Sequence, residues 1–283
     1  MTPTVASIVA GAGELSALPD SWQRIDAVVA HSASSTAQIA EAIALDPGLS
    51  ARLLRMANSP MFGLNQRVER LSQAVHLIGT RQLRELALAA TVIDLVSGGP
   101  GRRERIESFL RHSTATGLCA RAIASHRREA NIERFFVAGL LHDIGLFTFE
   151  IAEPDLTAEL LATARARGEP LERVEAARLG FDHAAIGGAL LQRWNLPPSL
   201  SEPVAWHHQP VAAPTCRVEA AVVHIASTAI ELLGYGGEHG VSTPLEAQAW
   251  ELVGLDTQAL ISAASEAESM LTQTLGVLGG TAA

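Results

Sequence analysis

Apolar residues recur at spacings of three and four along most of the chain, the period of a helix with one buried face. The first clear segment opens at Leu18-Pro19-Asp20 and places Ile25, Val28 and Val29 on one face. Ser34, Ser35 and Thr36 are candidate caps for the next segment, and Asp46-Pro47 starts a third, with Asp as the N-cap and Pro at the first helical position. Alternating apolar and polar runs bounded by Asn-Gly or Asp-Gly turns do not occur. The pattern therefore predicts an all-α fold.

Later segments repeat the helical period, interrupted by Gly and Pro. We expect helices over residues 71–78, 81–96, 103–125 and 132–143, with Gly145 as the C-terminal cap of the last. A final helical pair should begin near Pro244 and divide near Gly254.

The strongest linker signal is the stretch SGGPG at residues 97–101. It divides the sequence into an N-terminal tail (1–17), a first helical subdomain (18–97), a second helical subdomain (102–235) and C-terminal helices (241–283).

Composition narrows the function classes. Hydrophobic residues make up 48% of the chain and the formal net charge is −9, so a DNA-binding surface is not expected. Local arginine clusters at 102–105 and 121–128 are typical of solvated helix faces. No apolar run approaches the ~18 residues of a membrane span. The first residues lack the basic start of a signal peptide, and Cys119 and Cys216 form no disulfide framework, which indicates a cytoplasmic protein.

Candidate chemistry centres on histidine. His142 and Asp143 are adjacent at the end of a very apolar segment, where a carboxylate must be paired or metal-bound. Alone, the pair is more typical of a helix-ending Asp that forms hydrogen bonds with the local backbone. His112, His183, His207 and His208 also lie on or next to predicted helices, and such residues can meet inside a helical bundle. We expect a pocket built from His112, His142, Asp143, His183 and at least one of His207 and His208.

Several of these segments resemble known families. Residues 46–63 (DPGLSARLLRMANSPMFG), 74–79 (AVHLIG) and 81–88 resemble the N-terminal signature of HDOD domains. Residues 138–145 (AGLLHDIG) resemble the HD phosphohydrolase superfamily. Residues 183–191 and the His207-His208 pair resemble its HD-GYP branch. The resemblance covers about residues 18–230 and implies an N-terminal HDOD subdomain packed on an HD-like helical bundle.

By that resemblance, His112, His142 and Asp143 match metal ligands, and His183, His207 and His208 match ligands of a second metal. Three positions depart from it: Ser227 stands for an expected Asp, Leu146 for an expected Lys, and Gln209-Pro210-Val211 for a Gly-Tyr-Pro segment. With Asp143 as the one carboxylate assigned to the pocket, we expect it to hold at most one divalent transition metal (iron, manganese or zinc).

Two functions remain open. The first is a bacterial signalling regulator that works through contacts with other signalling proteins, with little or no catalysis and with a nucleotide or anion as the candidate ligand of its pocket. The second is a metal-dependent phosphodiesterase acting on a cyclic dinucleotide. The three departures favour the regulator, and the surviving histidines favour the enzyme.

Overall fold

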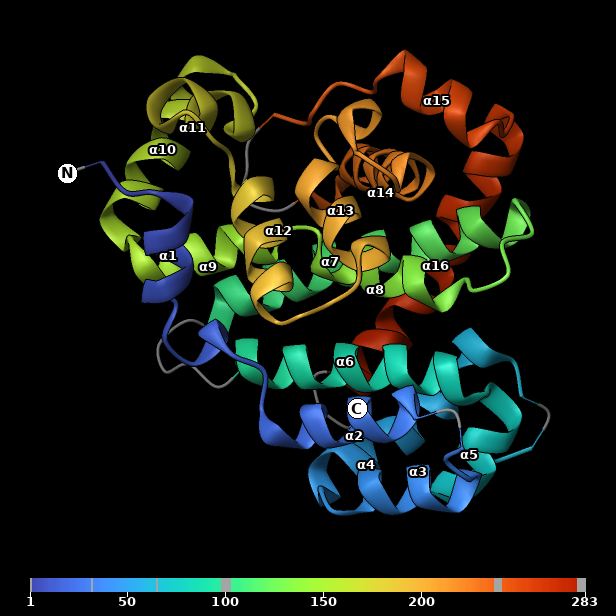
Figure 1. Cartoon of the computed structure of the whole chain (residues 1–283). Coiled ribbons are helices and arrows are strands. Elements are labelled where there is room, and N and C mark those ends of the chain that lie inside the picture. The colour runs from blue at the N-terminus through green and yellow to red at the C-terminus, as the bar shows by residue number, and fades with distance from the viewer. Residues whose placement is uncertain (1, 32, 65, 98–102, 237–240, 279–283) are drawn as a thin grey trace. The chain divides into compact units, whose positions relative to one another are not determined.

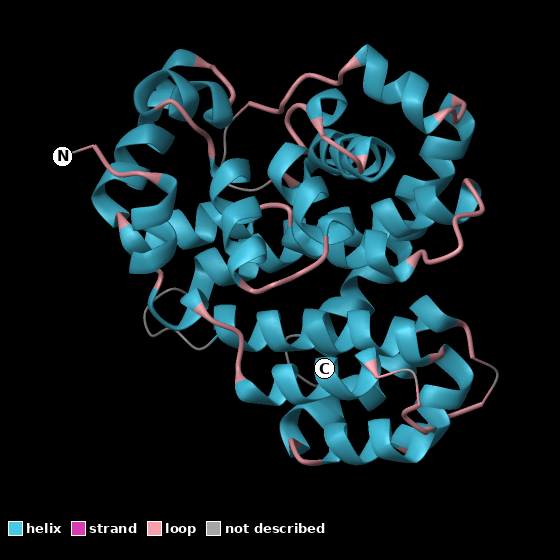
Figure 2. Cartoon of the chain, in the orientation of Figure 1, coloured by secondary structure: helices cyan, strands magenta, loops and turns pink. Residues whose placement is uncertain are grey.

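Helices and the loops between them make up the computed structural model, which describes residues 2–31, 33–64, 66–97, 103–236 and 241–278. No strand occurs in these ranges, and the all-α prediction is confirmed (Figure 2). The chain divides into two compact units, one formed by residues 1–17 and 104–268 and the other by residues 18–103 and 269–283. The predicted linker at 97–101 lies almost entirely outside the described residues, as do the last five residues.

The second of these units holds five helices of the N-terminal half: α2 (Asp20–Ala30), α3 (Thr36–Ala44), α4 (Pro47–Ala57), α5 (Leu71–Ile78) and α6 (Thr80–Ser97). Helix α4 begins as the sequence predicts, because the Asp46 side chain accepts a hydrogen bond from the Leu49 amide at 3.0 Å and Pro47 occupies the first turn. A capping box between Ser35 and Gln38 starts α3 in the same way. These caps and a core of aliphatic side chains account for the local fold.

The other unit contains most of the remaining helices (Figure 1): α1 (Val5–Gly11), α7 (Arg103–His126), α8 (Glu133–Leu141), α9 (Ile144–Ala152), α10 (Pro154–Arg167), α11 (Leu171–Leu179), α12 (His183–Arg193), α13 (Pro198–Trp206), α14 (Arg217–Ile230) and α15 (Ala247–Val253). Helix α16 (Thr257–Leu278) begins in this unit and ends in the other. Helix α12 packs against both α9 and α13, and α13 continues the contact to α8 and α14. The unit therefore has a core of crossing helices.

Two details differ from the sequence-based expectation. Residues 1–17 were expected to be a tail, but α1 packs against α9 and α12 and buries Ile8 and Val9. Gly145 was expected to cap a helix, but α8 ends at Leu141 and α9 begins at Ile144, so Gly145 lies in the first turn of α9. A Cβ at Gly145 would overlap the backbone oxygen of His183, so glycine is required there for α9 and α12 to approach.

A similar close approach joins α7 to α8. A Cβ on Gly139 would lie 2.8 Å from the Cα of Gly117, which is too close for any real side chain. Glycine at both positions lets the two helix backbones meet. As a result, the α7 side chains come within reach of the residues that follow α8.

Two helical stretches, Glu133–Ala152 and Arg217–Tyr235, are long and apolar enough to cross a membrane by length and composition alone. The fold buries 83% of the apolar window of the first and 50% of that of the second. The first stretch is α8 and α9 joined through His142 and Asp143, which explains why no single long run stands out in the sequence. Core helices of globular proteins pass the same test, so these two stretches are weak evidence for a membrane.

Candidate metal centre

Six polar side chains meet inside the first unit, and we call them the histidine cluster: His112, His142, Asp143, His183, His207 and His208. They come from α7, the junction of α8 and α9, the start of α12 and the end of α13. His208 is half-buried, and the other five are buried, each with 1–4% of its surface exposed. The structure therefore brings together all six residues that the sequence analysis singled out.

The cluster contains two groups of closely spaced donor atoms. His112, His142 and Asp143 form one, and His183, His207 and His208 form the other, each with its candidate ligand atoms within 4.8 Å of one another. In the first group, Nε2 of His112 lies 3.1 Å from Nε2 of His142. In the second, Nε2 of His208 lies 2.9 Å from Nε2 of His183.

Asp143 links the two groups. Its Oδ2 lies 3.4 Å from Nε2 of His112 and 3.2 Å from Nε2 of His142. Its Oδ1 lies 3.4 Å from Nε2 of His183 and 3.6 Å from Nε2 of His207. One carboxylate therefore presents one oxygen to each group.

Hydrogen bonds on the far side of the rings orient the histidines. The Nδ1 atoms of three of them donate to backbone oxygens: His112 to Tyr235 at 3.0 Å, His142 to Gly139 at 2.7 Å and His207 to Val204 at 2.8 Å. Because a carbonyl oxygen can only accept, the proton belongs on Nδ1, and in the neutral ring the lone pair of Nε2 then points into the cluster. This arrangement is typical of histidines that bind metal.

The inward-facing nitrogens suit a cation. Nε2 of His207 is buried and has no hydrogen-bond partner among the described residues. Nε2 of His112 and of His142 face each other, so two lone pairs meet unless a proton or a metal lies between them. Imidazole and carboxylate together are ligands for divalent transition metals. The donor set therefore fits such a metal.

Burial and charge set the protonation states. Burial lowers the pKa of His142 to about 4 and, together with His207 and His183, holds the pKa of His208 well below its usual value. Burial alone would raise the pKa of Asp143, but the charge of His142 and hydrogen bonds from the surrounding histidines hold it well below its usual value. Burial alone would also lower the pKa values of His112 and His183, but Asp143, and at His183 Glu175 as well, raise them, that of His183 well above its usual value. At neutral pH His142 and His208 are thus neutral and Asp143 is ionised.

Of the positions that depart from the HD-GYP resemblance, Ser227 lies beside the cluster and Leu146 follows Asp143 by three residues in sequence. The Ser227 hydroxyl on α14 is 3.3 Å from Nε2 of His142, at the place where the resemblance expects a carboxylate. Leu146 is buried in the first turn of α9. Neither residue brings charge to the site.

Sequence reasoning missed a second buried carboxylate. The expectation that Asp143 alone supplies charge to the pocket is wrong, because Glu175 on α11 lies 2.7 Å from Nδ1 of His183 and is 1% exposed. Glu172 on the same helix accepts a hydrogen bond from Thr243 at 3.2 Å, and the Thr243 hydroxyl lies 3.5 Å from Nδ1 of His208. Glu175 occupies an ordinary-looking helical segment eight residues before His183, so no spacing rule distinguishes it from a solvated glutamate.

A hollow of 400 Å³ borders the cluster at His208. Its walls combine several Ala and Gly residues with larger side chains, namely Phe181, Asp182, Gln192, Trp206 and Gln209. The hollow therefore gives a small molecule a place beside the second group of donors.

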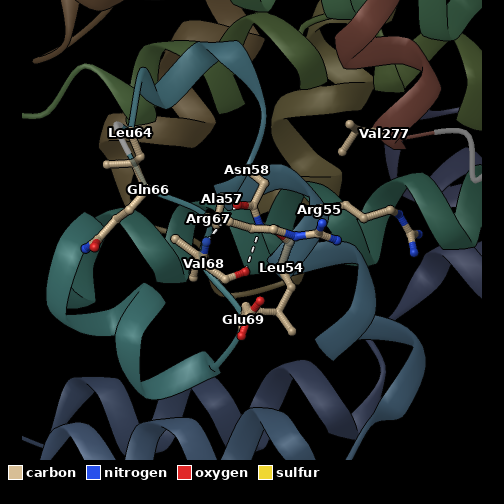
Figure 3. A pocket seen from close by; sticks show the side chains of 10 residues that line it. All are labelled: Leu54, Arg55, Ala57, Asn58, Leu64, Gln66, Arg67, Val68, Glu69 and Val277. Atoms are coloured by element: carbon tan, nitrogen blue, oxygen red, sulfur yellow. Dashed lines mark hydrogen bonds between the residues drawn. The ribbon is translucent and has the colours of Figure 1, made fainter.

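The unit formed by residues 18–103 and 269–283 has a separate hollow of 710 Å³, drawn in Figure 3. Arg55, Arg67 and Glu69 surround it, and the Asn58 amide holds the adjoining loop by hydrogen bonds to both the N–H and the C=O of Val68, each 2.8 Å long. Leu54 to Asn58 belong to the signature at 46–63, and nearby Arg52 bonds to the Ala90 oxygen and pairs with Asp94. The part of the signature around Asn58 thus builds a helix and its loop.

Comparison with known proteins now decides the family. The model of the HDOD domain matches residues 15–210. The chain belongs to the HDOD family. The matched residues include all six members of the histidine cluster.

Solved structures share this fold. An HDOD domain protein of unknown function from Geobacter sulfurreducens is 23% identical, with a TM-score of 0.73 over 97% of this chain and 98% of that one. A candidate phosphohydrolase from Shewanella amazonensis SB2B is 26% identical, with a TM-score of 0.75 over 98% of each chain. This chain is also 28% identical over 214 residues to an uncharacterised protein of Treponema pallidum (strain Nichols), and the match covers 75% of this chain and 41% of that protein. The chain therefore spans less than half of that relative.

Proposed function

We propose that this HDOD protein is a bacterial, cytoplasmic signalling regulator that acts by contact with other signalling proteins and carries a divalent transition metal in its histidine cluster. The observation that carries the metal proposal is the orientation of the rings. His112, His142 and His207 each donate a hydrogen bond from Nδ1 to a backbone oxygen, so that Nε2 points inward. Iron, manganese and zinc all accept this donor set.

The metal would be held by Asp143 together with the histidines of one or both groups. When bound, such an ion supplies a Lewis acid and can acidify a coordinated water. The residues of the chain orient the ligands through the backbone oxygens of Tyr235, Gly139 and Val204. A small anion or nucleotide would enter through the hollow beside His208.

The chemistry around the cluster favours regulation over turnover. Phosphate transfer needs positive groups that stabilise developing negative charge. The position expected to carry a lysine is Leu146, and all 21 basic residues of the chain are arginines, so no lysine from elsewhere can replace it. Asp143 and Glu175 also place negative charge against the histidines of the cluster, which opposes the binding of a phosphate.

A surface turn could report the state of the cluster to a partner. The π-helical turn η4 (Glu231–Tyr235) accepts the His112 hydrogen bond through the Tyr235 oxygen. The same turn exposes Leu232 and Leu233, with 78% and 46% of their surfaces accessible. Exposed large apolar side chains are typical of protein contact sites when they occur together. A shift of His112 on metal binding would move the turn that carries them.

The alternative function is a metal-dependent phosphohydrolase. It is favoured by the two donor groups that share Asp143, since paired metal sites are common in phosphoester hydrolysis. Similarity to the Shewanella amazonensis SB2B candidate phosphohydrolase points the same way.

Two measurements separate these functions. Elemental analysis of the full chain, purified without added metal or chelator, should find iron, manganese or zinc, and His142→Ala should lose it. Hydrolysis of cyclic di-GMP with each metal in turn should then show no metal-dependent turnover. Turnover that His142→Ala and Asp143→Ala abolish would replace the regulator with the enzyme, and a metal-free protein that binds none of the three ions would refute the metal site.

A further inference from the structure

Glu175 contacts the histidine cluster from outside it through two hydrogen bonds to His183. Its Oε2 accepts a hydrogen bond from the backbone N–H of His183 at 2.9 Å and another from Nδ1 of the same residue at 2.7 Å. One carboxylate oxygen thus holds both the main chain and the ring of a single histidine.

We propose that Glu175 is the positioning residue of the second donor group, and that its charge allows His183, His207 and His208 to bind a divalent transition metal. The inference rests on the proposed metal site. Glu175 is not one of the six residues of the histidine cluster, and its effect on metal binding can be tested separately from theirs.

Local structure explains how Glu175 reaches His183. Helix α11 ends at Leu179, and Gly180 reverses the chain with a φ of +85°. Asp182 then caps α12 by accepting a hydrogen bond from Ala185 at 3.0 Å, which makes His183 the first residue of the new helix. The turn brings the first residue of α12 back against the middle of α11.

The contact changes the ring chemistry of His183. Its Nδ1–H points at a carboxylate, whereas those of His112, His142 and His207 point at neutral backbone oxygens. A carboxylate behind a histidine fixes the tautomer and strengthens the ring as a ligand. His183 is therefore the ligand whose metal affinity depends most on a charged neighbour.

Glu175 also adds negative charge beside the second donor group. Asp143 shares its single charge between the two groups, and all members of the second group are imidazoles. A dication held there by neutral rings alone would be a poorly compensated buried charge. With Glu175 in direct contact with His183, a second negative charge lies beside this group.

A purely structural role for Glu175 would predict different behaviour. In that case the carboxylate serves only as a hydrogen-bond acceptor at the start of α12. Glu175→Gln separates the two roles, because the carboxamide oxygen can accept the same two hydrogen bonds while the charge is lost. Glu175→Asp does the opposite, keeping the charge while shortening the reach.

The experiment titrates the full chain with Co²⁺ or Zn²⁺ against a competing chelator and counts bound metal after dialysis. Thermal unfolding in chelator checks each variant for folding. Glu175→Gln should bind roughly 10- to 100-fold more weakly at the site that His208→Ala also removes. Glu175→Asp should bind more tightly than Glu175→Gln, and the cobalt absorption spectrum should change in Glu175→Gln.

Glu133→Gln is the matched control, since Glu133 is also buried in this unit, at 5% exposure, and pairs with Arg121 at 3.3 Å. It should keep the wild-type metal affinity. Equal affinities for wild type and Glu175→Gln, or weaker binding by Glu175→Asp than by Glu175→Gln, would overturn the role of Glu175 while leaving the metal site intact. A wild-type chain that takes up no metal would instead overturn the proposed function itself.

Discussion

Oδ1 of Asp143 lies 3.4 Å from Nε2 of His183, although three helices, α9, α10 and α11, separate the two residues in sequence. The contact depends on how closely α9, which begins directly after Asp143, packs against α12, which begins with His183. Gly145 stands at that crossing, where a Cβ would overlap the His183 oxygen. Ligand geometry and helix packing are therefore set by the same few atoms.

Gly145→Ala should force α9 and α12 apart. We expect a loss of about 1–3 kcal/mol in the free energy of unfolding, typical of overpacking, together with weaker metal binding as Asp143 moves from His183. Urea unfolding and metal titration measure the two effects. Gly48→Ala is the control, because Gly48 lies in α4 and a Cβ there would have ordinary contacts only, the nearest at 3.5 Å from Asp46. The control should leave stability unchanged or raise it by up to about 1 kcal/mol; an equal loss in both variants would contradict the packing argument.

The sequence predicted the helices and the members of the histidine cluster because both leave local signals. Caps such as Asp46, the helical period and the His142-Asp143 pair are visible in short windows. Glu175 leaves no such signal, since its contact with His183 arises from the fold of the turn between α11 and α12. The role of Gly145 was misassigned for the same reason: a glycine required by a neighbouring helix looks the same in sequence as a glycine that ends a helix.

The two cysteines should differ in reactivity. Burial raises the pKa of the Cys119 thiol to about 12, so almost none of it is thiolate at pH 8. Cys216 is partly exposed and follows a loop at the start of α14. A thiol reagent should modify one cysteine per folded chain and both after denaturation. Cys216→Ser should abolish the native reaction, and modification of Cys119 in the folded state would show that α7 opens more readily than its burial implies.

Glu202 should stabilise the start of α14 in a pH-dependent way. Its carboxylate accepts hydrogen bonds from the backbone of Thr215 and of Cys216, each 2.8 Å long, and these bonds lower its pKa despite the opposing effect of burial. Because the folded pKa lies below the unfolded one, the contribution is present above the ordinary carboxyl pKa of 4.5 and is lost as the pH falls through the folded pKa.

Glu202→Gln should therefore lower the free energy of unfolding by about 1 kcal/mol at pH 7, because hydrogen bonds to a charged acceptor contribute more than those to a neutral one, and by less at pH 3. Thermal unfolding at both pH values measures the difference. Glu159→Gln, an exposed residue of α10, is the control and should show no such change. A Glu202→Gln effect that stays constant down to pH 3 would show that the charge of Glu202 does not contribute.

Ser227→Asp tests whether a missing carboxylate limits the first donor group. The Ser227 hydroxyl lies 3.3 Å from Nε2 of His142, so an aspartate there would add a charged ligand beside His112, His142 and Asp143. Without metal, the new carboxylate faces Asp143 across a buried site, and like charges should destabilise the chain. With metal, the same charge should tighten binding by roughly tenfold or more, which is about 1.4 kcal/mol. The rise in melting temperature on adding Mn²⁺ should therefore be larger for Ser227→Asp than for wild type, because ligand stabilisation grows with affinity.

The control is Ser227→Asn, whose side chain has nearly the same shape as that of Asp without the charge, and it should behave like wild type. If Asn and Asp raise the response equally, side-chain size rather than charge limits the group, and if neither does, the hydroxyl position lies outside the metal's reach.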